Sequence, residues 1–404
     1  MSKELSIRQS WLLVLLVSIM IIVTVVPFLD TVSYSIVLAI IIALGLSMSS
    51  EIIRTKPFKF MVLFILVEVV YALGEKGLPI KMVIYQSLEF FAAIVLCYYI
   101  KLLSKKQIDF LLYLMIGLFL YTFIITYINL LSDNMIIRLY GYGGEGNRYG
   151  EHIRGVYSYG FGEALSIIIP VMTYISIDIK RIFIKILFAF LIFAGIVTQV
   201  MAALTTSALL SIIFSALVVL FSVNYSRKRM NRFFLLIIFV ISIVLFFRLL
   251  PNVQNDLFLL KMDDIGQSYE RGSSEGQVYS RITLYEQSLK VCAHNPILGL
   301  GDLPKEYGYY SDNMVGFHSA ILDYWGLYGL FVILLMISWK ETIRQFFFIL
   351  SKDKRKILRC AIYSLFFLLL LKGPVTIGTN FIFSTILMVI LLMADYYSHV
   401  TRVS

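Results

Sequence analysis

The chain has 404 residues, of which 59% are hydrophobic and only 15% are charged, and its mean hydropathy is +0.86. These values exclude a soluble globular protein and indicate a polytopic membrane protein with a single transmembrane domain over residues 1–404. The net charge of +10 does not indicate a nucleic-acid partner, because the Lys and Arg residues form short clusters between apolar runs.

Apolar runs long enough to cross about 30 Å of hydrocarbon recur along the chain. The first has no small-x-small cleavage site and is interpreted as an uncleaved anchor. The run over residues 182–223 is too long for one crossing, and Thr198, Gln199, Thr205 and Thr206 mark a turn within it. We therefore predict an all-α bundle of about 12 transmembrane helices. The predicted spans cover residues 11–29, 32–48, 58–73, 82–103, 110–131, 161–177, the two halves of 182–223, 233–250, 319–339, 357–371 and 375–397.

Most Lys and Arg residues fall in alternate connections, starting with the N-terminal segment. Because positive residues near span ends resist translocation, both termini are predicted to be cytoplasmic, and residues 132–158 and 251–317 to form two extracytoplasmic loops. Cys97, Cys292 and Cys360 follow no metal-binding or redox spacing, and only Cys292 would face the outside. An intrachain disulfide is therefore not expected.

The loop over residues 132–158 combines arginines and tyrosines with several glycines. Arg148 and Arg154 are predicted to bind phosphate, and Tyr157 to stack on a sugar. The alternative is a flexible loop with interfacial tyrosines.

Two acidic residues lie within predicted spans, Glu68 in the third and Glu89 in the fourth. Both would sit about 10 Å deep at about 1.5 Å per residue, which suggests a shared polar cavity that binds substrate. A protonated or Lys-paired structural glutamate is the alternative for each.

The loop over residues 251–317 is too long to be a simple connection. Its acidic first half lacks the spacing of a calcium loop and is interpreted as solvated. In its second half, Ser280 is the predicted N-cap of a helix over residues 281–293, which Pro296 ends. The predicted buried face of this helix consists of Ile282, Tyr285, Leu289 and Cys292.

Arg281 would lie in the first turn of this helix, where free N–H groups reinforce its attraction for a diphosphate. An arginine bound to lipid headgroups is the alternative. Gly299 and Gly301 permit a tight turn or the close approach of a ligand, which alone is a weak signal. His318 opens the tenth span and is a candidate general base or hydroxyl-binding group; the alternative is an interfacial histidine. Asp323, within the same span, is a candidate for substrate binding.

These segments together resemble a known family. Arg281-Ile-Thr-Leu-Tyr, Asn295-Pro-Ile-Leu-Gly-Leu-Gly301, and His318 with Gly326 and Gly329 resemble the core of the bacterial O-antigen polymerase and O-antigen ligase family. Arg154-Gly-Val-Tyr157 resembles the entry to its sixth span. The chain departs from the family at Ser319, where members often have Asn, and at Ser207-Ala208, where members have Ser-Arg.

The resemblance implies a membrane glycosyltransferase of the bacterial cytoplasmic (inner) membrane, a Wzy-type polymerase of undecaprenyl-diphosphate-linked oligosaccharides into surface polysaccharide such as capsule or lipopolysaccharide. Arg281 and Arg154 would hold the leaving diphosphate without a metal, and His318 would act on the acceptor hydroxyl. No cofactor and no nucleic acid are expected. The lipid bilayer surrounds the protein, and the resemblance also admits a chain-length regulator and a flippase as partners.

Two alternatives stay open. The family motifs are shared by polymerases and ligases, so glycan transfer to a different acceptor fits them equally. A polysaccharide flippase or secondary transporter would suit about 12 spans and the pair Glu68 and Glu89, although we find no internal repeat, and the polar residues concentrate in the outer loops.

Overall fold

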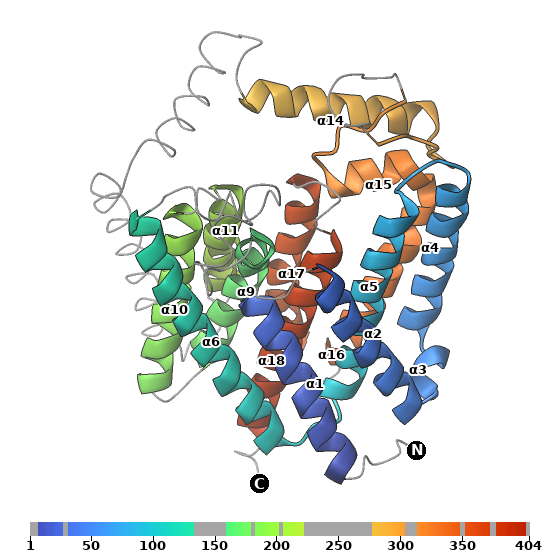
Figure 1. The fold of residues 1–404 in the computed structure, drawn as a ribbon. Helices are drawn as coiled ribbons and strands as arrows, with labels where there is room; N and C mark the ends of the chain where they lie inside the picture. The colour runs from blue at the N-terminus through green and yellow to red at the C-terminus, as the bar shows by residue number, and fades with distance from the viewer. Residues whose placement is uncertain are drawn as a thin grey trace.

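The computed structural model describes residues 7–26, 31–132, 159–178, 182–201, 205–221, 277–303, 313–347, 352–371 and 377–400. These residues form an all-α bundle in which no strand occurs (Figure 1). The predicted span at 233–250, most of the loop at 132–158 and the first half of the loop at 251–317 lie outside this description. The all-α fold class is therefore confirmed.

Helices lie where the apolar runs predict them. The split of residues 182–223 is confirmed, since α10 ends at Met201 and α11 begins at Thr205. The helices of the bundle are α1 (Ile7–Val25), α2 (Thr31–Met48), the short α3 (Glu51–Arg54), α4 (Lys56–Leu73), α5 (Ile80–Ile100), α6 (Lys105–Ser132), α9 (Tyr159–Asp178), α10 (Ile182–Met201), α11 (Thr205–Phe221), α17 (Lys352–Leu371) and α18 (Ile377–Val400).

Four described segments are long and apolar enough to cross a membrane, at Ile80–Ile100, Lys105–Asn129, Ile182–Val200 and Ala320–Phe346. Six further apolar helices are shorter. Membrane spanning is thus supported, while the number of about 12 crossings stays a prediction.

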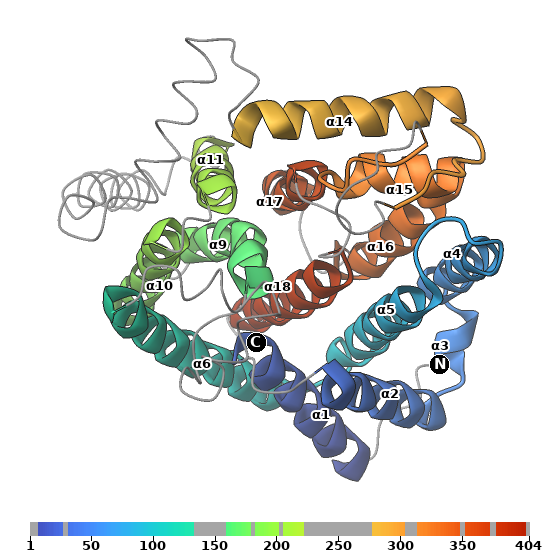
Figure 2. The same cartoon turned by 45° about the horizontal axis from the view of Figure 1, so that its top comes forward.

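Helix α18 lies in the middle of the bundle (Figure 2). Its residues 386–393 are almost fully buried on every side, with exposed fractions of 0–3%. A helix that is apolar all round is buried by its neighbours, and α18 packs on α5, α6 and α9. This central helix joins the N-terminal and C-terminal parts of the chain into one body.

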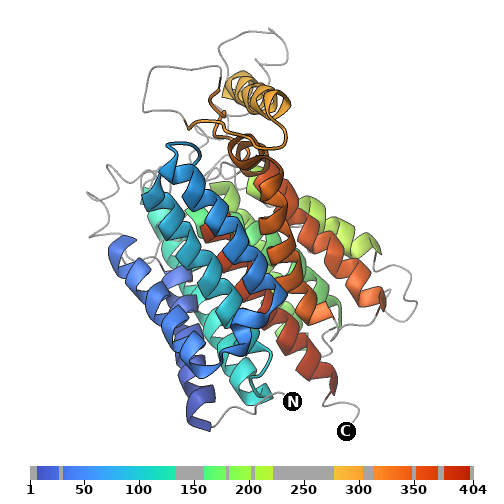
Figure 3. The ribbon, with the colours of Figure 1, turned by 90° about the vertical axis from the view of Figure 1, so that its right-hand side faces the viewer.

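The segment predicted as one span at 319–339 is broken. Helix α15 (Ala320–Tyr328) ends at Gly329, a 3-10 turn follows over Gly329–Phe331, and α16 (Val332–Phe347) continues the segment. Helix α14 (Gln277–His294) lies across the end of the bundle, beside α15 and far from both chain termini (Figures 1 and 3). The segments that carry Arg281 and His318 therefore lie together at what we call the α14 end of the bundle.

Candidate functional site

Helix α14 begins earlier and turns differently from the prediction. It starts at Gln277, so Ser280 is not its N-cap and Arg281 lies in the second turn instead of the first. The predicted buried face is confirmed at Cys292 and in part at Tyr285, which is half-buried, but it is wrong at Ile282 and Leu289, whose exposed fractions are 48% and 50%. The short polar side chain of Ser288 is fully buried instead. Its hydroxyl forms a hydrogen bond with the buried Asp323 carboxylate, which an aliphatic side chain at this position would leave without that partner.

The face of α14 that packs on the bundle carries Ser288, Val291 and Cys292, with exposed fractions of 0%, 2% and 4%. Position 281 lies seven residues before Ser288, which is two helical turns along the same face. The side chain of Arg281 lies outside the described set. The backbone nevertheless places this position about 10 Å along α14 from Ser288.

The Gly-x-Gly turn approaches the protein's own backbone. The Leu300 N–H donates to Leu327 O at 3.1 Å, and the Gly301 N–H donates to Gly326 O at 2.9 Å. These bonds satisfy carbonyl groups at the C-terminal end of α15, which a helix of nine residues otherwise leaves open. The turn therefore caps α15, and of the two readings of Gly299 and Gly301 the structure shows the tight turn.

Close backbone contact explains the glycines on both sides of the junction between the Gly-x-Gly turn and the end of α15. A Cβ atom at Gly299 would lie 2.4 Å from the Gly329 nitrogen, and one at Gly329 would lie 2.0 Å from Ile297 O. Both glycines have a positive φ, of 75° and 58°. Side chains at these positions would push the turn away from α15.

The connection between α4 and α5 supports the same junction from the other side. Lys76 Nζ lies 3.0 Å from Asp302 Oδ1, and the Leu78 N–H donates to the Tyr328 hydroxyl at 3.0 Å. A Cβ at Gly77 would meet the Tyr328 ring at 2.8 Å. Sequence reasoning missed Lys76, Asp302 and Tyr328, since no spacing rule links residues more than 200 positions apart.

His318 lies in a turn that the buried carboxylate of Asp323 organises. The Ser319 N–H donates to Asp323 Oδ2 at 2.9 Å, and the Phe317 N–H donates to Oδ1 at 3.2 Å. Phe317 has a φ of 61°, a strained left-handed conformation for an aromatic residue, directly before the histidine. The imidazole itself is half-buried, with Nδ1 3.3 Å from Gly316 O.

Asp323 was predicted to bind substrate. Its side chain is fully buried, and both carboxylate oxygens accept hydrogen bonds from the chain. This arrangement favours a role in positioning the His318 turn over direct substrate contact. The partner that sequence reasoning missed is Ser288, whose hydroxyl donates to Asp323 Oδ1 at 2.5 Å.

Glu68 and Glu89 share a buried polar cluster centred on Tyr324. Both carboxylates lie close enough to Tyr324 to interact with it electrostatically, and the Tyr324 hydroxyl donates to Gln86 Oε1. The Tyr328 hydroxyl also faces Glu68, although neither Glu68 oxygen makes a hydrogen bond of good geometry. Both glutamates therefore lie near Tyr324, while their shared cavity and their contact with substrate stay predictions.

Arg148, Arg154 and Tyr157 lie outside the described residues, as do Asp263, Asp264, Glu270 and Glu275. Within the described part of the chain, no group of three or more His, Cys, Asp and Glu residues has the arrangement of a metal site. Ser207 and Ala208 are both buried near the start of α11.

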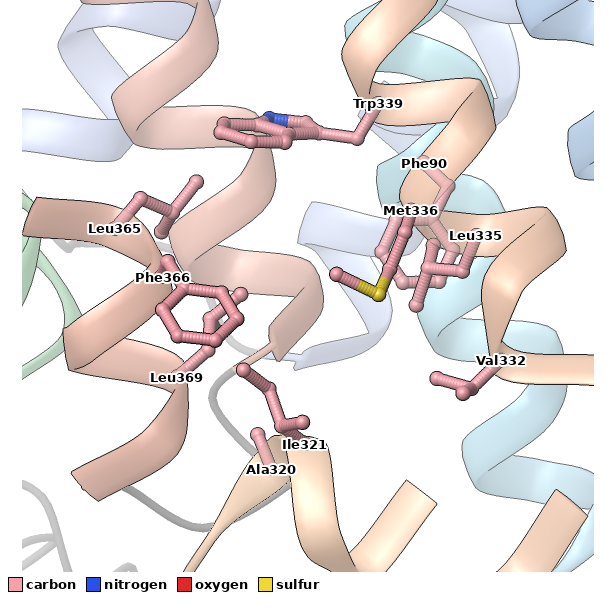
Figure 4. A pocket seen from close by; sticks show the side chains of 10 residues that line it. All are labelled: Phe90, Ala320, Ile321, Val332, Leu335, Met336, Trp339, Leu365, Phe366 and Leu369. Carbon is pink, nitrogen blue, oxygen red and sulfur yellow. The ribbon is translucent and has the colours of Figure 1, made fainter. Parts of the chain in front are cut away.

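An apolar pocket of about 70 Å³ adjoins the first residues of α15, which follow the His318 turn in the sequence (Figure 4). Ala320 and Ile321 close one end and Trp339 the other, with α17 residues such as Phe366 along the side (Figure 4). Phe366 on α17 and Met336 on α16 have exposed fractions of 40% and 42%, so the pocket reaches the surface of the bundle. Its lining suits hydrocarbon.

The turn that bears His318 lies against the helix that bears Arg281, next to an apolar pocket. A histidine can transfer a proton, an arginine can bind a phosphate, and the pocket can hold hydrocarbon.

Comparison with known proteins identifies a matching family model. Residues 191–337, from α10 to α16, match the family model described as O-antigen ligase, and this range contains Arg281, the Gly-x-Gly turn and His318. No curated protein matches the chain significantly. The match supports the resemblance seen in the sequence, and residues 191–337 of the chain form a region similar to the O-antigen ligase family.

Proposed function

We propose that the chain polymerises undecaprenyl-diphosphate-linked oligosaccharide repeat units on the outer face of the bacterial cytoplasmic membrane. The observation that carries this proposal is the contact between α14 and the His318 turn, where the helix that bears Arg281 is hydrogen-bonded to the segment that bears His318. The family match includes both segments. In this proposal both termini, which lie at the opposite end of the bundle (Figure 3), face the cytoplasm.

The reaction is a displacement at the anomeric carbon of the donor glycan. The oxygen of an acceptor sugar hydroxyl forms a bond to that carbon, while the bond from the carbon to the diphosphate oxygen breaks. His318 takes the proton of the acceptor hydroxyl as general base, and the electron pair leaves with undecaprenyl diphosphate. Arg281, with Arg154 and Arg148, binds the diphosphate as its charge develops.

The apolar pocket suits the lipid part of this donor. It starts at Ala320, two residues after His318, and its lining is hydrocarbon apart from the Met336 thioether and the Trp339 indole, whose N–H donates to Thr385 Oγ1. A segment of polyprenyl chain in this pocket would place the diphosphate close to the His318 turn. Tyr157 would stack on a sugar, and the Glu68 and Glu89 cluster would lie beneath the acceptor.

A ligase that transfers finished glycan to a different acceptor is the second candidate, because the matching family model is described as O-antigen ligase. Product size separates the two activities. Purified protein in detergent would be incubated with defined undecaprenyl-diphosphate repeat units and EDTA, and the products resolved by length. The proposal predicts a ladder of several repeats. If the protein does not lengthen a cognate repeat unit but transfers it to an acceptor that is not lipid-linked or that carries a different lipid, the activity is that of a ligase instead.

A further inference from the structure

We propose that Ser288 and Asp323 form a buried clamp that locks helix α14 to the His318 turn and fixes both the orientation and the tautomer of His318. The inference rests on the proposed function, for which His318 is the base. It assigns positioning roles to two residues that do not themselves contact the reacting atoms.

The clamp consists of short, fully buried hydrogen bonds. The Ser288 hydroxyl donates to Asp323 Oδ1 at 2.5 Å, and it accepts the Gly316 N–H at 2.8 Å. Both side chains have an exposed fraction of 0%. Because a buried polar group that loses its partner costs free energy, these bonds hold the two segments in one relative position.

Gly316 transmits this position to the histidine. Its N–H is bound by Ser288, and its carbonyl oxygen lies 3.3 Å from His318 Nδ1. A Cβ atom at Gly316 would lie only 1.9 Å from Leu284 O on α14, so the turn lies directly against the helix backbone. No side chain fits between the helix and the turn.

The tautomer follows from the chemistry of the carbonyl. A carbonyl oxygen can only accept, so a hydrogen bond to Gly316 O requires the proton on Nδ1 and leaves on Nε2 the lone pair that would receive the proton of the acceptor hydroxyl. Asp323 fixes the same turn on both sides of His318 through the Phe317 and Ser319 N–H groups. The clamp thus sets which nitrogen acts as the base.

The clamp also sets the distance between the two groups of the proposed site. Ser288 lies two turns after position 281 on the same helix. A change in the Ser288–Asp323 contact therefore moves the arginine-bearing helix relative to the histidine. Displacements of about 1 Å in a reacting pair cost about 100-fold in rate.

The test compares Ser288→Ala and Asp323→Asn with Ser338→Ala. Ser338 is an equally buried serine that donates to Pro57 O at 2.7 Å in another part of the bundle, so it controls for the loss of one buried hydroxyl. The assay measures kcat and KM for glycan transfer. We expect kcat to fall by about 10- to 100-fold in both clamp variants with little change in KM, while Ser338→Ala keeps the wild-type kcat.

A second readout does not depend on activity. The rate at which diethyl pyrocarbonate modifies His318 at pH 7 would be followed by peptide mass spectrometry, with the exposed His294 as internal reference. We expect faster modification of His318 in both clamp variants, because the turn loosens, and the wild-type rate in Ser338→Ala. Unchanged modification and unchanged kcat would overturn the clamp while leaving the proposed function intact. Faster modification in a protein that transfers no glycan would retain the clamp and overturn the proposed function.

Discussion

Buried polar side chains on α14 decide its orientation at the scale of single residues. Cys292 lies next to the clamp, and its thiol is 3.3 Å from Leu322 O. Burial, and to a smaller extent the nearby charge of Asp323, raises the pKa of Cys292 to about 12. The reactive thiolate is therefore nearly absent from Cys292 at neutral pH.

This raised pKa predicts that Cys292 resists maleimide labelling in the folded protein. Ala293→Cys, one position further along on an exposed site, is the matched control. Between pH 7 and 9 the labelling rate of Ala293→Cys should rise with the thiolate fraction, whereas Cys292 stays unlabelled because that range lies far below its pKa. Peptide mass spectrometry measures both, and rapid labelling of Cys292 would contradict the observed face of α14.

Which residues face the bundle was only partly predictable from the sequence. Apolar periodicity placed a helix near residues 281–293, but it assigned Ile282 and Leu289 to the buried face, and they are exposed. The true face is set by Ser288, whose partner Asp323 lies 35 residues away, beyond the reach of any local pattern. Periodicity records where apolar side chains lie, and in a membrane protein the exterior is also apolar.

The broken segment α15–α16 is the central feature at the scale of elements. Sequence length predicted one continuous span, because the break is marked only by Gly329, and a single glycine is tolerated in many helices. The structural reason for the break between α15 and α16 is the Gly-x-Gly turn, which lies against Gly329 and caps the end of α15.

Substitution of a motif glycine tests this junction. Gly299→Ala should lower the free energy of unfolding by more than about 2 kcal/mol, since it combines a positive φ with a 2.4 Å contact to the Gly329 nitrogen. Gly117→Ala on α6 is the control, because a Cβ there meets nothing within 4 Å. That change should stabilise the protein by up to about 1 kcal/mol.

Thermal unfolding in detergent measures both variants. Equal stability of Gly299→Ala and wild type would show that the turn does not depend on contact with α15.

The whole molecule places its two termini at one end and α14 at the other (Figures 1 and 3). Composition was enough to predict an all-α membrane protein, and the bias of Lys and Arg predicted which end is cytoplasmic. Packing around α18 was not predictable, because most helices in the bundle carry long apolar runs and the sequence does not rank their burial.

This orientation predicts the side from which α14 can be reached. A membrane-impermeant maleimide added to intact spheroplasts should label Ala293→Cys, and should not label a cysteine added at the C-terminus until the membrane is permeabilised. The reverse pattern would contradict the assignment of the α14 end to the outer face.

The most direct test of the account is the rate at which the purified protein releases undecaprenyl diphosphate from a defined lipid-linked repeat unit during transfer to an acceptor. Loss of a positioned general base costs about 100- to 10,000-fold, so His318→Ala should reduce this rate by that factor. Arg281→Ala should reduce it strongly as well, because the leaving diphosphate loses a charged partner. Release at the wild-type rate by both variants, with the fold intact, would contradict a glycan-transfer site at the α14 end.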